Sequence, residues 1–429
     1  MGNNRFKDVS EQSGLGGKNL VGGPAVAFDY DNDGLLDIYI NYFGDYIHGV
    51  LPTLARRNTN GLPNKLFHNE GNFQFKDLTA GSGVDNTGWG QALTHTDLDR
   101  DGWQDLIVGN DFGVNAYYRN KGDGSFENIA DKLGTGKPSY TMGVGISDLN
   151  KDLYPDIYIS NIVTMNKDEK YVAPNQNTPM KLNPQKLASM RVIEANDLFI
   201  SQTSQTKLAG YKLSSNVDRG YSSTGWSWGA DFFDVDNDGD DDLYVANGMN
   251  DFNLYSNENP YYTDPLSNKS YNAYLPDSSK ESNVFFINTK GKLQNISEQS
   301  GANIVSNSRS VAYLDYDNDG DLDMLLNNYH EAAVLFRNNT QQSTANWLKI
   351  KLIGDPNQHS NRDAIGARII VTTASGIQLW REIHSGVGYL TMHPKQQHFG
   401  LGKQENVTLS IEWPNGDKLV FDKVTANKS

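Results

Sequence analysis

Pairs of short apolar runs recur along the chain, and each pair encloses a polar segment rich in Asp. The first pair is 25–28 and 38–40, and later polar segments are followed by similar runs at 106–108, 157–159 and 243–245. Runs this short, rich in Val, Ile and Tyr and bounded by turn residues, are typical of strands. The pattern therefore predicts a repeated strand–turn–strand unit.

A second pattern follows each unit and predicts a β-hairpin. Alternating apolar residues broken by an Asn/Gly turn occur at 64–79 and 118–128, with weaker echoes at 196–200, 283–288 and 334–338. Two strands around the polar turn and two in the hairpin make four strands per repeat, which is the size of a propeller blade. Five repeats are clear, and we expect seven blades because seven is common in such propellers.

Two repeats are longer than the others because they contain insertions, around 163–196 and 251–281. Long insertions on a rigid scaffold often carry recognition, although mobile surface loops of no specific function have the same composition.

The polar segments have oxygen-bearing side chains at positions 1, 3, 5 and 9, and four of the five have Gly at position 6. This spacing suits Ca²⁺, which takes six to eight oxygen ligands, and the Gly permits a sharp turn. An EF-hand would need Glu at position 12, where the first segment has Ile40. The predicted ligands are Asp29, Asp31, Asp33, Asp37, Asp97, Asp99, Asp101, Asp105, Asp148, Asn150, Asp152, Asp156, Asp234, Asp236, Asp238, Asp242, Asp315, Asp317, Asp319 and Asp323.

One such segment alone would be an ordinary Asx turn as readily as a metal site. Five copies in one register favour the metal, with four to five ions per chain. The third copy is the weakest, because it has Asn150 in place of an acid, Leu153 in place of Gly, and Pro155.

Charge and composition restrict the environment and the partners. A net charge of −15 argues against nucleic acid as a partner. The chain has no Cys and no apolar stretch that could span a bilayer. Its start, 1–6, lacks a signal-peptide core, and we expect an export signal to have been removed. The expected location is secreted, periplasmic or at the cell surface.

The tail predicts a separate domain. Alternating apolar residues at 348–352, 368–371, 377–379, 407–411 and 419–421 are typical of a compact antiparallel β domain, and a sandwich is expected. We therefore divide the chain into a propeller at 1–345 and a β domain at 346–429. A set of tail residues could form a polar site or could fix turns: Asn361, Arg362, Asp363, His384 and Tyr389.

The repeats resemble FG-GAP or VCBS propeller repeats. The tail motifs 361–368, 381–389, 398–402 and 411–416 resemble the ASPIC/UnbV domain of the cartilage acidic protein family, whose bacterial members join that domain to FG-GAP repeats. The resemblance implies an exported calcium-binding protein associated with extracellular recognition. A few propellers similar to these are enzymes that cyclise or alkylate natural products.

Catalytic motifs do not decide between these functions. No HExxH, GxSxG, Walker or nucleotide-binding pattern is present. Residues preceding the Asp-rich turns could line the propeller axis as an aromatic pocket with one cation, or could pack between blades: Trp89, Tyr140, Met142, Trp226, Trp228 and Arg309. We expect a calcium-binding β-propeller that recognises a protein or a glycan. The alternative is an enzyme acting on a small aromatic molecule at the axis.

Overall fold

The computed structural model describes residues 6–15, 20–52, 57–162, 196–205, 207–214, 221–222, 224–248, 280–340 and 345–428. Strands dominate these residues, so the predicted all-β fold class is confirmed. The described helices are short: α1 (Ser10–Ser13), η1 (Tyr46–His48), α2 (Ala130–Leu133), α4 (Ser297–Ser300) and η6 (Pro356–Gln358). None of them is long enough to cross a bilayer. The predicted insertions, 163–196 and 251–281, lie almost entirely outside the described residues.

Five antiparallel sheets, which we number in chain order, follow the predicted repeats. Their strands are β1 (Gly22–Phe28), β2 (Asp37–Tyr42), β3 (Lys65–Asn69) and β4 (Phe75–Asp77) in sheet 1; β5 (Gly90–Thr96), β6 (Asp105–Asn110), β7 (Ala116–Asn120) and β8 (Phe126–Asn128) in sheet 2; β9 (Thr141–Ser147), β10 (Asp156–Asn161), β11 (Asp197–Ser204) and β12 (Lys207–Leu213) in sheet 3; β13 (Ser227–Phe233), β14 (Asp242–Asn247), β16 (Val284–Thr289) and β17 (Lys292–Asn295) in sheet 4; and β19 (Ser308–Leu314), β20 (Asp323–Asn328) and β21 (Val334–Phe336) in sheet 5. A small extra pair joins β15 (Glu281–Ser282) to β18 (Val305–Ser306). The number of blades, seven, stays a prediction.

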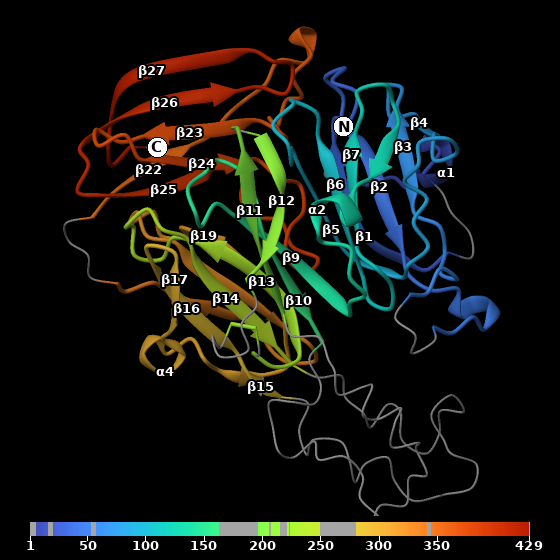
Figure 1. Ribbon diagram of the computed structural model, residues 1–429, viewed down its shortest axis with the longest axis horizontal. Helices are drawn as coiled ribbons and strands as arrows, with labels where there is room; N and C mark the ends of the chain where they lie inside the picture. The colour runs from blue at the N-terminus through green and yellow to red at the C-terminus, as the bar shows by residue number, and fades with distance from the viewer. Residues whose placement is uncertain are drawn as a thin grey trace, which may run out of the picture.

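The first strands of the five sheets lie beside one another in chain order, from β1 through β5, β9 and β13 to β19. Figure 1 shows the sheets fanned around this inner row. A separate apolar core fills each gap between neighbouring sheets; the core between sheets 1 and 2, for example, contains Phe28, Tyr39, Leu93 and Leu106. This radial stacking is the arrangement of propeller blades.

The burial of the strands follows from the stacking. In sheets 2, 3 and 4 every residue of the second strand is buried, because a neighbouring sheet covers each face. This explains why the sequence there has continuous apolar runs rather than alternation. Sheet 5 has no following sheet among the described residues, and its Leu325 and Leu335 are 42% and 49% exposed.

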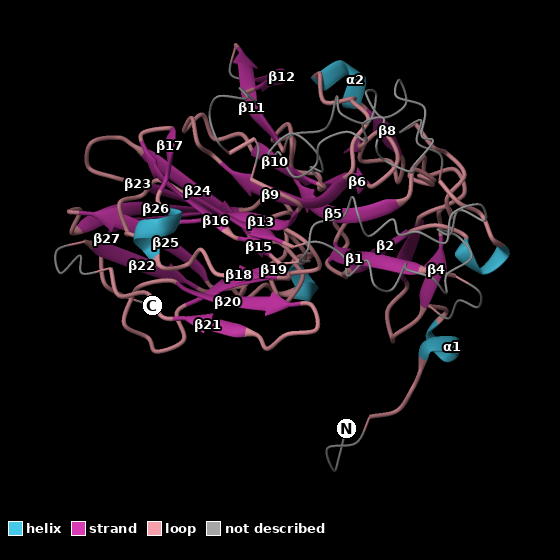
Figure 2. Ribbon diagram, turned by 90° about the horizontal axis from the view of Figure 1, so that it is seen from below, coloured by secondary structure: helices cyan, strands magenta, loops and turns pink. Residues whose placement is uncertain are grey.

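The C-terminal strands form two further sheets around a core of their own (Figure 2). One sheet pairs β22 (Asn346–Ile350) with β25 (Gln397–Gly402). The other has the order β24 (Gln378–Glu382), β23 (Arg368–Thr372), β26 (Asn406–Glu412) and β27 (Lys418–Thr425). Leu36, from the first Asp-rich turn, packs against this core, which already places the C-terminal domain beside the propeller turns.

The inner hairpins give the propeller two distinct faces. In sheet 1, Phe28 pairs with Asp37 at one end of the β1–β2 hairpin, and Gly22 pairs with Tyr42 at the other end. The Asp-rich turns therefore lie at the first end, which we call the loop face. The connections from the second to the third strand of each sheet leave from the opposite end, which we call the connection face.

Candidate metal centres and axial site

Each Asp-rich turn is held by the same backbone hydrogen bonds. We name the turns loop 1 (29–37), loop 2 (97–105), loop 3 (148–156), loop 4 (234–242) and loop 5 (315–323). In loop 1 the carboxylate at position 1, Asp29, accepts hydrogen bonds from the amides of Asp33 (3.1 Å) and Gly34 (2.9 Å). The equivalent carboxylates accept the same pair of bonds in the other loops: Asp97, Asp148, Asp234 and Asp315.

The carboxylate at position 9 ties each loop to the third strand of its sheet. Asp37 accepts bonds from the amides of Tyr30 (3.2 Å) and Asn69 (2.8 Å). The same two bonds recur in the remaining loops at Asp105, Asp156, Asp242 and Asp323. The backbone therefore fixes positions 1 and 9 of every loop without help from an ion.

Position 6 adopts the left-handed conformation in all five loops. Gly34 has φ 92° and Gly320 has φ 100°, values that favour glycine. Loop 3 has Leu153 at this position with φ 67°, so the same turn forms there with a residue that strains it.

Position 3 behaves differently in loops 1, 2 and 4, because backbone amides do not hold both oxygens of its carboxylate. In loops 1, 2 and 4 one oxygen of this carboxylate, Oδ1 of Asp31, Asp99 or Asp236, is buried without a hydrogen-bond partner. Carboxylate oxygens from positions 1, 3 and 9 lie within 4.8 Å of one another in loops 1, 2, 4 and 5. An all-oxygen donor set with orphaned buried oxygens fits Ca²⁺, which would supply the missing partner.

Electrostatics support a bound cation in these loops. Burial, with a further contribution from Asp33 and Asp31, raises the pKa of Asp29 to about 7 despite the hydrogen bond from Gly34. Burial likewise raises the pKa of Asp37 to about 8 and that of Asp97 to about 7. Crowded carboxylates with raised pKa values are stabilised in the ionised form when a metal binds.

In loop 3 the carboxylate at position 5, Asp152, has hydrogen-bond donors from the loop itself and from β11. The Asn150 amide at position 3 donates to Oδ2 of Asp152 (3.1 Å), and the Ser201 hydroxyl donates to the same oxygen (2.9 Å). These donors supply the partners that a cation would supply in the other loops. Weak metal binding at loop 3 remains a prediction, and these two bonds give it a physical reason.

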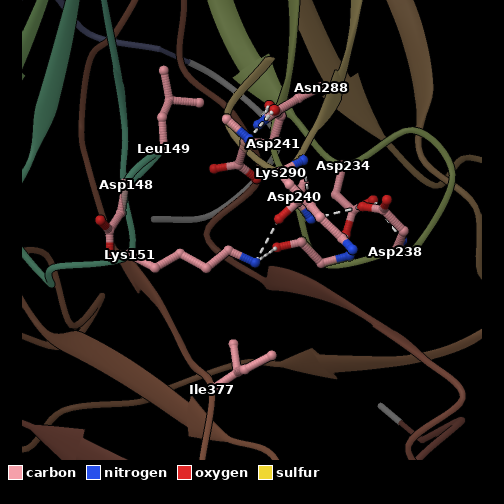
Figure 3. Close-up of polar contacts among 12 residues, drawn as sticks. Asp148, Leu149, Lys151, Asp234, Asp238, Asp240, Asp241, Asn288, Lys290 and Ile377 are labelled. Carbon is pink, nitrogen blue, oxygen red and sulfur yellow. Dashed lines mark hydrogen bonds and ion pairs between the residues drawn. The ribbon is translucent and has the colours of Figure 1, made fainter. Parts of the chain in front are cut away.

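The five loops lie next to one another through their position-4 residues. The Asn32 amide donates to the Gly102 carbonyl of loop 2 (3.3 Å). From loop 3, Lys151 reaches the Gly239 carbonyl (3.3 Å) and the Asp240 carboxylate of loop 4, as Figure 3 shows. The loops therefore form one continuous acidic surface.

The C-terminal domain covers this surface with at least one polar contact to each loop. The contacts are His359 Nδ1 to the Asp33 carbonyl (3.2 Å), the Asp97 amide to Glu382 (3.3 Å), Arg368 to the Leu153 carbonyl, His398 to Asn237 (2.6 Å), and Lys349 to Asp315. Four of the five side chains from the domain are basic or His, which complements the acidic loops.

Residues 384–393 of the C-terminal domain enter the row of inner strands, and we call them the axial segment. The Ser385 hydroxyl accepts a hydrogen bond from the Ala27 amide on β1 (2.9 Å). The Gly386 carbonyl accepts one from Thr94 on β5 (2.7 Å), and Gly388 bridges to β9. His393 pairs with Asp231 on β13 (2.7 Å). His393 also accepts a hydrogen bond from the Tyr313 amide on β19 (3.2 Å), so this one segment contacts all five sheets from the axis.

Contacts in two groups involve four of the six residues predicted for an aromatic axial pocket, and the pocket itself stays a prediction. The Trp89 ring is fully buried and contacts Phe112 (5.8 Å), which in turn contacts Tyr140 (5.8 Å). A second group places the Arg309 guanidinium over the Trp228 ring (4.1 Å).

The remaining two predicted residues are Met142 and Trp226, and Ile162 links Trp226 to the Tyr140 carbonyl (3.1 Å). Met142 is buried, and Trp226 bridges to Ile162 while its amide bonds to Glu281 (2.8 Å).

Sequence reasoning missed the contribution of the tail to the axis. Tyr389 packs on Trp228 (5.0 Å), and its tail position gave no signal that it would lie there. A cavity of about 110 Å³ does lie between sheets 4 and 5 and the C-terminal domain, lined by His393, Asp231, Glu382 and His384 among others. None of the six predicted residues lines this cavity.

His95, which precedes loop 2, is buried against the tail. Its Nε2 accepts a hydrogen bond from the Ser385 amide (3.0 Å), so Nδ1 carries the proton that is donated to Gln104. Burial, together with the charge of His384, lowers the pKa of His95 to about 4. The neutral ring is therefore a structural link between the propeller and the axial segment.

The other predicted tail residues fix turns or pair at the surface. The Asn361 side chain bonds to both the amide (2.9 Å) and the carbonyl (2.8 Å) of Ile365, and Asp363 pairs with Lys395. The two bonds of Asn361 are of the turn-fixing kind considered for this set of residues.

Two parts of this chain match known protein families. Residues 97–159 match the FG-GAP-like repeat, and residues 357–429 match the ASPIC and UnbV family. The first match spans loops 2 and 3, and the second spans the domain that covers the loop face. The resemblance seen in the sequence is confirmed.

Similar curated proteins are cartilage acidic protein 1 from several vertebrates. The human protein is 25% identical over 435 residues, covering 99% of this chain and 56% of its own length. The mouse protein is also 25% identical, with 99% and 57% covered. The chain thus spans little more than half the length of these relatives.

A solved structure of an exo-beta-1,3-galactanase from Phanerochaete chrysosporium with beta-1,3-galactotriose also matches. It is 9% identical, with 95% of this chain and 82% of that chain covered and a TM-score of 0.30. A similarity this low carries no argument about the function or the fold.

Proposed function

We propose that the protein is an exported, calcium-binding recognition module that binds a protein or a glycan on the connection face of its propeller. The observation that carries this proposal is the position of the C-terminal domain, which contacts all five loops and covers the loop face. The connection face is left for a partner, and β10 and β14, the strands that precede the predicted insertions, end at this face.

The connection between β2 and β3 supports this assignment. It contains η1, and Tyr46, Ile47 and Leu51 there are 44%, 55% and 44% exposed. Behind them the Tyr46 ring packs on buried Trp89 (5.3 Å), so this apolar surface has a rigid base. Exposed apolar groups on a rigid base are typical of interaction sites.

Calcium has a structural role in this proposal. Loops 1, 2, 4 and 5 bring carboxylates together, and the orphaned oxygens of Asp31, Asp99 and Asp236 are the observation that favours an ion. Ca²⁺ would neutralise the loop face and thereby stabilise the scaffold that carries the connection face.

The test begins with a screen of the calcium-loaded protein against extracellular proteins and glycans. For any ligand found, Ile47→Asp should weaken binding at least about tenfold, because it places a charge in the apolar surface. Val420→Asp, at an exposed apolar site on the C-terminal domain, is the matched control and should leave affinity unchanged. Equal loss in both variants, or no loss in Ile47→Asp, would rule out the connection face as the binding site.

A further inference from the structure

Loop 5 differs from loops 1, 2 and 4 in the buried lysine that contacts its position-1 carboxylate. Its position-3 carboxylate, Asp317, pairs with Arg337 (3.0 Å), and Arg337 also lies 3.5 Å from Asp319. At position 1, the Lys349 ammonium contacts Oδ2 of Asp315. In loops 1 and 2 the position-3 carboxylate also has a basic or histidine neighbour, His68 at 3.4 Å and Arg119 at 3.8 Å, so it is the lysine at position 1 that sets loop 5 apart.

The two cations beside loop 5 are held very differently. The Arg337 side chain is 55% exposed, so it can turn into solvent at little cost when a metal arrives. Lys349 is 7% exposed and belongs to β22, where its amide bonds to the Lys428 carbonyl (2.9 Å). Its ammonium also lies over the ring of Trp347 (4.8 Å).

The neighbours of Lys349 fix β22 directly on the loop. The Trp347 indole packs so closely on Gly320, at position 6, that an added Cβ would lie 2.0 Å from Nε1. On the adjacent strand β25, His398 pairs in register with Lys349 and bonds to Asn237 of loop 4. Lys349 therefore cannot leave Asp315 unless this edge of the C-terminal domain moves away.

Calcium and the ammonium group compete for the same carboxylate. A bound Ca²⁺ would need loop oxygens at about 2.3–2.6 Å. A lysine ammonium in contact with one of those ligands would then lie within a few ångströms of a doubly charged ion, and in a partly buried site their repulsion is strong. Only one of the two cations can neutralise Asp315.

We propose that Lys349 fills the cation position of loop 5, so that docking of the C-terminal domain and Ca²⁺ binding at this loop exclude one another. The inference rests on the proposed calcium binding of loops 1, 2 and 4. While the domain is docked, loops 1, 2 and 4 bind Ca²⁺, and loop 5 binds it only when β22 leaves the loop face.

The experiment compares Ca²⁺ stoichiometry, measured by equilibrium dialysis at one fixed free calcium concentration, in the whole chain and three variants. The wild type should bind three ions, and Lys349→Met should bind one more, because the loop keeps its carboxylates and loses its internal cation. Adding Asp317→Asn to Lys349→Met should remove the extra ion, which assigns it to loop 5. Lys351→Met, an exposed lysine two residues further along, is the charge-matched control and should bind as the wild type does.

The outcomes separate the two proposals. No ion in any variant would overturn the proposed calcium binding itself. Ions in the wild type with no gain in Lys349→Met, or a gain that Asp317→Asn leaves in place, would overturn the role of Lys349 while calcium binding stands. If Lys349→Met fails to fold, Lys349→Gln, which keeps a polar end group, is measured in its place with the same expected gain.

Discussion

The acidic residues of a loop divide into two kinds according to their hydrogen bonds. Positions 1 and 9 accept two backbone amides each and shape the turn, as Asp97 and Asp105 do in loop 2. Position 3, Asp99, has a buried oxygen without a hydrogen-bond partner. Residues of one type in one nine-residue segment thus have separable roles, one in folding and one in the proposed metal binding.

Asp99→Asn should therefore lower the melting temperature in calcium and leave it nearly unchanged in chelator. The substitution removes a proposed ligand. It also removes the repulsion between Asp99 and Asp101, which is the second cause, burial being the first, of the raised pKa of Asp99. Asp105→Asn should lower the melting temperature in both conditions, because one of its two buried backbone bonds is lost at a cost of about 1–2 kcal/mol. Thermal melts of both variants with and without chelator check this, and equal calcium dependence of the two would contradict it.

At the scale of elements, an asparagine on the third strand joins neighbouring sheets. The Asn120 amide donates to the Gln104 carbonyl within sheet 2 (3.2 Å) and to the Tyr30 carbonyl in loop 1 (2.7 Å). Asn338 makes the same pair of bonds from sheet 5 to Leu322 and to Val235 in loop 4. In sheet 3 the equivalent residue is Ser201, whose hydroxyl bonds within loop 3 instead.

Asn120→Ala should destabilise the fold by about 2–3 kcal/mol, because it leaves two buried carbonyls without a donor. Asn339→Ala is the control, since Asn339 is exposed and makes only a long bond to Arg337 (3.4 Å); it should cost less than about 0.5 kcal/mol. Denaturant unfolding of both variants measures the difference. A loss in Asn120→Ala no larger than that in the control would contradict the joining role.

At the scale of the whole molecule, the C-terminal domain holds the propeller sheets together at the axis and on the loop face. Glu382 shows how tightly it is integrated: its buried carboxylate accepts hydrogen bonds from Thr96 (2.6 Å) and Gln104 (2.6 Å) on sheet 2. Burial alone would raise its pKa, but the bond and charge of His384, the charge that His95 gains only below its own pKa of about 4, and the bond from Thr96 lower it to about 2.

A folded-state pKa of about 2, below the ordinary 4.5 of Glu, gives a definite pH dependence. The ionised carboxylate stabilises the folded state fully above pH 4.5, and this contribution is lost as the pH falls from 4.5 toward 2. Glu382→Gln should therefore be less stable than the wild type at neutral pH, and the gap should narrow below pH 4.5. Melting temperatures of both proteins across this range test it, and a gap that stays constant would contradict it.

The sequence by itself determined the features that depend on neighbouring residues. Every bond that shapes loop 1 from within, such as Asp29 to Gly34, joins residues at most eight positions apart, so the spacing of Asp and Gly was enough to predict the turn. The strand pairs beside it and the β character of the tail followed from equally short patterns. Position 1 has the same geometry in all five loops, and this geometry has the same local origin.

Tertiary structure alone decided which of these parts meet. Tyr389 lies on Trp228, His393 on Asp231 and Lys349 on Asp315, across separations of 34 to 162 residues that no local pattern encodes. From the sequence, only propeller residues were expected to line the axis, and no residue was predicted to cover the loop face. The reason is physical. The acidic loops are buried on one side and attract positive charge. The basic side chains that contact them come from strands of the C-terminal domain, and only folding brings these together.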